Sequence, residues 1–184
     1  MKPISLASVL AFLVLASVVA ADLTWNSEFE NTLYNTPKGW STTRNSGTVT
    51  LIPPDLKERE QAAIVITPGG ELTGDFKEAL SQFRAELRGN AKATESKVES
   101  TTADEGYPVL YVAEQLQDEK GAPTQYRYFF ASHPGDRVEF VMLIANNPET
   151  YSKYGKAFEE FVKTLTYKNA RPGARVTTAP TTQK

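Results

Sequence analysis

The sequence of 184 residues predicts a single α+β domain, an α/β/α sandwich in which two main helices flank a mostly antiparallel sheet. Three observations lead to this fold class. Most of the chain consists of short extended segments separated by turn residues, and two longer segments carry apolar residues at helical spacing. Between residues 109 and 145, consecutive β segments are joined by links too short for a parallel crossover.

The composition is that of a globular protein, with 40% hydrophobic and 10% aromatic residues. The chain has no cysteine, which excludes disulfides, thiolate chemistry and Cys-containing zinc sites. Its formal net charge of −2 argues against a general nucleic-acid binder, because such a protein would be basic. We therefore expect no nucleic-acid partner.

Residues 1–21 have the pattern of a secretory signal peptide, cleaved after Ala20 or Ala21. Lys2 forms a short positive region, residues 4–19 are apolar, and small residues precede the cleavage site. The alternative is an uncleaved N-terminal anchor, although an apolar run of about 17 residues lies at the lower limit for spanning a bilayer. The leader predicts a secreted or periplasmic protein with no stable membrane insertion after cleavage.

The first half of the domain, which we expect to run over residues 22–168, is predicted to be mainly β. The expected strands are residues 29–35, 40–44, 48–52 and 62–67. Asn45-Ser46-Gly47 predicts a hairpin turn between the second and third strands, because Asn and Gly tolerate positive φ. The charged run 55–61 is expected to be a solvated loop.

A helix is predicted to follow Asp75, which can cap the first turn, with Glu78 completing a capping box and Gly89 ending the helix. Apolar residues recur along it at spacings of three and four, as an amphipathic helix requires: Phe76, Ala79, Leu80, Phe83 and Leu87.

A second helix is predicted to start at Asn147, with Pro148 at the favoured first position. Its expected core stripe is Tyr151, Tyr154, Phe158, Phe161, Val162 and Leu165. Its expected solvent face is Lys153, Lys156, Glu159, Glu160 and Lys163. Residues 169–184 are rich in Thr and Pro without periodicity, which predicts a disordered tail.

Between the helices, residues 109–117, 125–132 and 137–145 predict an antiparallel meander. The last of these strands alternates two apolar sets, Val138, Phe140, Met142 and Ile144 against Val141, Leu143 and Ala145. A strand that is apolar on both faces is expected at the centre of the sheet, covered on both sides.

This order of elements resembles the PsbP-like fold. The resemblance rests on that order, on Pro37-Lys38-Gly39-Trp40 after the first strand, and on a final helix ending in Phe161-Val162-Lys163-Thr164-Leu165. The fold is shared by extrinsic subunits of photosystem II, the nuclear Ran-binding protein Mog and bacterial envelope proteins. The resemblance implies a non-catalytic partner-binding or assembly module. No site residue carries over from it.

His133 is the only histidine, and with Ser132 and Asp136 it could form a nucleophilic site. Because triad members normally come from separate elements, we favour a simple turn residue. A carboxylate pair could also serve a hydrolase, and the acidic pairs are Glu28/Glu30, Glu58/Glu60, Asp104/Glu105, Asp118/Glu119 and Glu159/Glu160. No loop has the spacing of a calcium or phosphate site, so we expect no metal and no cofactor.

Aromatic residues supply the remaining candidate site. Trp and Tyr anchor protein interfaces, and a binding surface could include Trp25, Trp40, Tyr107, Tyr111, Tyr126 and Tyr128, with His133 and the loop 102–108 nearby. The alternative, which we favour, is that these rings pack under a helix. Together these observations predict an exported, non-catalytic binding or accessory module of the cell envelope that acts through protein–protein contacts. The rival function is a secreted hydrolase.

Overall fold

The computed structural model describes residues 27–45 and 47–170. The predicted signal peptide, Trp25 and the tail from residue 171 lie outside the described residues. The strands are β1 Ser27–Phe29, β2 Thr32–Tyr34, β3 Ser41–Asn45, β4 Thr48–Ile52, β5 Ala62–Ile66, β6 Gly70–Glu71, β7 Lys92–Glu95, β8 Glu99–Thr102, β9 Pro108–Gln117, β10 Pro123–Ser132, β11 Arg137–Ala145 and β12 Thr166–Tyr167. The helices are α1 Phe76–Arg88 and α2 Pro148–Val162.

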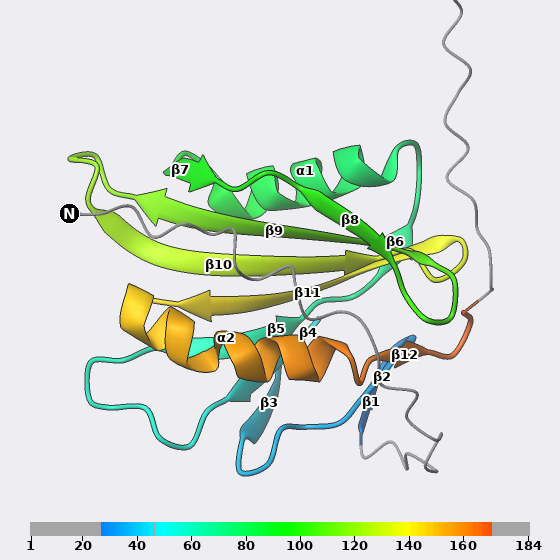
Figure 1. Ribbon diagram of the computed structural model, residues 1–184, viewed down its shortest axis with the longest axis horizontal. Coiled ribbons are helices and arrows are strands. Elements are labelled where there is room, and N and C mark those ends of the chain that lie inside the picture. The colour runs from blue at the N-terminus through cyan, green and yellow to red at the C-terminus, as the bar shows by residue number, and fades with distance from the viewer. Residues whose placement is uncertain (1–26, 46, 171–184) are drawn as a thin grey trace, which may run out of the picture.

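Most strands form a large sheet with the order β3-β4-β5-β11-β10-β9-β7. In addition, β6 pairs with β11 and β8 pairs with β9. All the strand pairs in the described residues are antiparallel. The hairpin β3-β4 and the meander β9-β10-β11 are those that the turn residues predicted. The α+β fold class is therefore confirmed, and Figure 1 shows the two helices on opposite sides of the sheet.

β11 lies at the centre of the sheet, as its apolar faces predicted, because each face packs in a separate core. On one face Val141, Leu143 and Ala145 join the core under α2. On the other face Val138 and Met142 join the core under α1. The register of β11 with β5 and β10 decides which of its residues enter which core, since a slip by one residue would exchange the two sets.

Both helices begin where the capping residues predicted. The Asp75 side chain accepts hydrogen bonds from the backbone N–H groups of Lys77 and Glu78 at 2.8 and 3.1 Å. The Asn147 side chain accepts from the N–H of Thr150 at 2.8 Å. These bonds satisfy amide donors that have no partner within the helix, which is why Asp and Asn are favoured there.

The structure corrects several element boundaries. Residues 29–35 are not one strand, because Glu30 adopts a positive φ of 51° and turns the chain between β1 and β2. These two strands form a small separate sheet with β12. β6, β7, β8 and β12 were not predicted, since they are short and lack an alternating apolar pattern.

The two helices cover different strands of the sheet. α2 lies over β11 and its neighbours β10 and β5, whereas α1 packs its apolar side on β9, β10 and β11 from the opposite face. As a result β9, β7 and β8 lie to one side of α2 in Figure 1. The face of β9 and β10 on the α2 side is therefore only partly covered. Neither described helix is long and apolar enough to span a bilayer.

Candidate functional site

Ser132, His133 and Asp136 do not assemble as a nucleophilic triad. The Ser132 hydroxyl donates a hydrogen bond to the hydroxyl of Tyr167 at 2.6 Å, on the α2 side of the sheet. The His133 ring packs against Phe76 of α1, with 5.6 Å between ring centroids. Burial lowers the pKa of His133, although the charge of Asp136 opposes this. The serine and histidine side chains therefore lie on opposite faces of the sheet.

Within residues 27–45 and 47–170, no group of three or more His, Asp or Glu side chains is placed to hold a metal ion. Three members of the predicted acidic pairs instead form ion pairs with lysines, and one of these is Glu60, which lies 3.8 Å from the ammonium of Lys57. Glu28 lies 3.0 Å from the ammonium of Lys168, and Glu160 lies 3.8 Å from that of Lys156.

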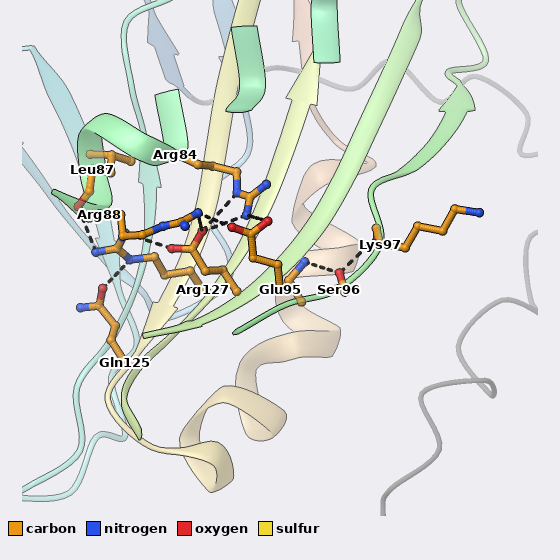
Figure 2. Close-up of polar contacts among 10 residues, drawn as sticks. Arg84, Leu87, Arg88, Glu95, Ser96, Lys97, Gln125 and Arg127 are labelled. Atoms are coloured by element: carbon orange, nitrogen blue, oxygen red, sulfur yellow. Dashed lines mark hydrogen bonds and ion pairs between the residues drawn. The ribbon is translucent and has the colours of Figure 1, made fainter. Parts of the chain in front are cut away.

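The largest group of charges is a buried ionic cluster that the sequence analysis missed. It lies between the last turns of α1 and strands β7, β9 and β10, and consists of Arg84, Arg88, Glu95, Glu114 and Arg127. Figure 2 shows the three arginines converging on this point from α1 and β10. A charged residue on an otherwise apolar stripe, as Arg84 is on α1 and Glu114 on β9, was the signal available in the sequence.

Glu114 is the centre of this ionic cluster. One of its carboxylate oxygens lies 3.0 Å from an Arg84 nitrogen and 3.1 Å from an Arg88 nitrogen, and its other oxygen lies 3.6 Å from Arg127. Glu95 lies at the solvent edge, with ion pairs to Arg84 at 2.7 Å and to Arg88. Because arginines of α1 form ion pairs with Glu95 and Glu114 of the sheet, the cluster holds α1 on the sheet and has a structural role.

A second buried carboxylate, Glu139, links the small sheet to the large one. It accepts a hydrogen bond from the side-chain amide of Asn31 at 3.1 Å and lies 3.5 Å from Arg137. Gly69 makes this approach possible, since a Cβ there would lie 2.0 Å from a Glu139 oxygen. Burial raises the pKa of Glu139, and its polar neighbours only partly offset that effect.

The structure brings three of the predicted aromatic residues together. Tyr111 of β9 lies beside Tyr128 of β10, with ring centroids 6.1 Å apart. Tyr126 of β10 lies 5.8 Å from Tyr151 of α2. All four rings are half-buried at the border between α2 and the exposed part of the sheet. We call Tyr111, Tyr126, Tyr128 and Tyr151 the tyrosine surface.

The other predicted residues lie elsewhere. Trp40 packs edge-on against Tyr154, with 5.6 Å between ring centroids, at the border of the α2 core. Tyr107 is buried against Tyr167 at the end of the loop 102–108. With His133 on the α1 side, these three residues do not join the tyrosine surface.

The sequence pattern indicated other roles for Tyr151, which is part of the tyrosine surface, and for Glu159, which is on the same helix. Tyr151 was expected in the core stripe of the helix and Glu159 on its solvent face, but both are half-buried. Burial and the negative charge of Glu159 raise the pKa of Tyr111 and of Tyr151 to about 12. The same two causes raise the pKa of Tyr128, so the negative charge of Glu159 acts on all three rings.

No protein-family model matches the chain, and no curated protein matches it in sequence. Solved structures are similar. Cyanobacterial PsbP (CyanoP) from Synechocystis sp. PCC 6803 matches with a TM-score of 0.55 at 10% identity, over 74% of this chain and 86% of CyanoP. The Ran-binding protein Mog1p from Saccharomyces cerevisiae matches with a TM-score of 0.52 at 13% identity, over 74% of this chain and 90% of Mog1p. Identities this low establish the fold alone, and the chain has the PsbP-like fold that its sequence predicted.

Proposed function

We propose that this protein is an exported, non-catalytic binding module of the cell envelope, and that the tyrosine surface contacts a partner protein. One observation carries the proposal: four half-buried tyrosines gather on a part of the sheet that α2 leaves partly open. Tyrosine is enriched at the centres of protein interfaces, because it offers a large apolar ring and a polar hydroxyl with few rotatable bonds.

The fold and the leader support the same proposal. Mog1p, which has this fold, is a Ran-binding protein, so the fold serves protein binding in at least that case. Residues 1–21 have the pattern that directs export. The buried carboxylates Glu114 and Glu139 are engaged in holding the domain together, which favours binding over hydrolysis.

Site-specific photo-crosslinking in the native host tests the binding surface. The variant Tyr126→p-benzoylphenylalanine places a crosslinker on the tyrosine surface. The matched control is Leu87→p-benzoylphenylalanine, because Leu87 is the exposed apolar residue of α1, on the opposite face. A discrete crosslinked protein from position 126 and none from position 87 is expected. Equal crosslinking from both positions, or none from 126, would contradict the proposal.

Intact mass of the protein recovered outside the cytoplasm tests export. We expect a chain that begins at Ala21 or Asp22, as the predicted cleavage sites require. A mass that includes residues 1–20 would show instead that the leader is retained as an anchor.

A further inference from the structure

The tyrosine surface carries a negative charge that the domain does not neutralise. The Glu159 side chain has no hydrogen bond or ion pair in the described part of the chain, whereas the side chain of the adjacent Glu160 is paired with Lys156. Glu99, which lies opposite Tyr111 in the β8–β9 pairing, adds a second negative charge that acts on Tyr128. A half-buried carboxylate that has no counter-ion within the domain is available to the positive charge of a ligand.

Open space lies next to this carboxylate. Tyr151, Gly155 and Glu159 are four residues apart in α2, so they follow one another along one face of the helix. A Cβ added at Gly155 would meet no atom within 4 Å. Glycine within a helix costs about 1 kcal/mol relative to alanine, and here it leaves open space at residue 155, one helical turn from Tyr151 and one from Glu159.

We infer that the tyrosine surface binds a lysine or arginine side chain of the partner protein, with its cationic end beside Glu159 above Gly155. This inference rests on the proposed function and names the chemistry of the partner. The faces of aromatic rings attract cations, and the apolar stem of a lysine or arginine packs well on such rings. The surface thus offers the two features that a cationic side chain needs, a ring wall and a counter-ion.

Binding of single amino-acid probes tests the inference directly. The exported protein, with isotope-labelled tyrosine rings, is titrated by NMR with Nα-acetyl-lysine methylamide and Nα-acetyl-arginine methylamide. Nα-acetyl-norleucine methylamide serves as the neutral control, since it keeps the apolar stem and lacks the charge. We expect the cationic probes to shift the resonances of Tyr128 and Tyr151, and norleucine to leave them unchanged. Equal shifts with norleucine would overturn the inference.

Two neighbouring carboxylates give a matched pair of variants. Glu159→Gln is expected to weaken binding of the cationic probes about tenfold, the effect of losing one close charge pair. Glu160→Gln removes a charge from the next residue of the same helix and is expected to leave binding within about twofold of the unaltered protein, since exposed charges contribute little. Equal weakening by both substitutions would mean that only the general negative charge matters, and would overturn the inference.

Gly155→Leu tests the position of the cation without removing a charge or a ring. The leucine side chain would fill the space above residue 155 and is expected to abolish the shifts caused by the cationic probes. The helix gains a residue of higher helix propensity, so we expect the variant to fold. Unchanged probe binding by Gly155→Leu would overturn the inference even if Glu159→Gln behaves as expected.

The experiments separate failure of this inference from failure of the proposed function. A partner crosslinked at position 126, together with no binding of cationic probes, would leave the binding module standing and remove its proposed chemistry. A small-molecule arm uses tetramethylammonium chloride. If it binds at the tyrosines more tightly than the lysine probe, and no protein crosslinks at position 126, the ligand is a free quaternary ammonium ion and the protein-partner inference is wrong.

Discussion

Two carboxylates of this domain, Glu114 and Glu159, lie on opposite sides of the sheet and in opposite electrostatic settings. Glu114 is enclosed by Arg84, Arg88 and Arg127 under α1. Glu159 is part of α2, its charge acts on nearby tyrosines, and its side chain has no basic partner in the described residues. In the first arrangement the domain itself supplies basic partners to the carboxylate, and these ion pairs hold α1 on the sheet. In the second arrangement the described part of the domain supplies no basic partner, so the α2 side is the one that can offer a negative charge to a ligand.

The largest expected change in stability is on the α1 side of the sheet. Glu114→Gln should destabilise the domain by about 3–5 kcal/mol, because it leaves buried arginines without their central counter-charge. Glu159→Gln is the control and should change stability by less than about 0.5 kcal/mol, since it breaks no contact. Urea unfolding of both variants measures the two free energies. Similar losses from both would abolish the distinction between the two sides.

Glu139 extends the comparison to a buried carboxylate that is only partly compensated. Because burial raises its pKa above the ordinary 4.5, the folded protein binds the proton more tightly than the unfolded chain does. The stabilisation from Glu139 is therefore present below pH 4.5 and is lost as pH rises through the folded-state pKa. Glu139→Gln should remove this part of the pH dependence, so its stability should gain on that of the unaltered protein as pH rises.

The control for that experiment is Glu95→Gln, for which the sign reverses. Burial acts to raise the pKa of Glu95, but hydrogen bonds and charges from Arg84 and Arg88 outweigh it and lower the pKa. Its stabilisation is present above the ordinary pKa of 4.5 and is lost as pH falls. If thermal melts across the pH range show the same slope change for both variants, the assignment of Glu139 as the destabilised carboxylate is wrong.

Substitutions of Gly155 test whether there is open space beside this residue of α2. Gly155→Ala should stabilise the domain by about 1 kcal/mol, because alanine favours the helix and its Cβ meets no atom within 4 Å. Gly89→Ala is the matched control. A Cβ there is equally unobstructed, but the φ of 57° disfavours any residue with a side chain. It should destabilise the domain by a similar amount. Thermal unfolding of both variants gives the two signs, and a loss for Gly155→Ala would mean that the space is filled.

The smallest expected effect concerns the tyrosines themselves. Glu159→Gln should lower the pKa of Tyr111 and of Tyr151 from about 12, because the negative charge that opposes their ionisation is gone. Both values should stay above the ordinary 10.0, since burial is the larger cause. An ultraviolet pH titration follows phenolate formation. Glu160→Gln should leave the titration unchanged, and a shift of equal size there would show that Glu159 has no special position.

Much of the fold could be predicted because the controlling signals are local. The alternation of β11 placed it at the centre of the sheet, and Asp75 and Asn147 marked both helix starts. The short strands β7 and β8 could not be found in this way. They are polar and exposed, and they exist because β9 offers them an unpaired edge.

The candidate site was predicted only in part, for a related reason. Tyr126 and Tyr128 are two residues apart on β10, so strand alternation puts both on one face, and in the structure both contact α2. Alternation could not show that Tyr107 would be buried against Tyr167, or that Ser132 and His133 would face different helices. Those outcomes depend on residues distant in the chain.

The sequence by itself determined the periods, the caps and the turns, since each depends on neighbours within a few residues. It thereby determined an antiparallel sheet with a doubly buried central strand and two amphipathic helices. Only the tertiary structure decided which charges found partners. Arg84 and Glu114 meet across thirty positions of chain, while Glu159 remains among tyrosines. Charge pairing depends on distance in space and on burial, and neither can be read from residue spacing along the chain.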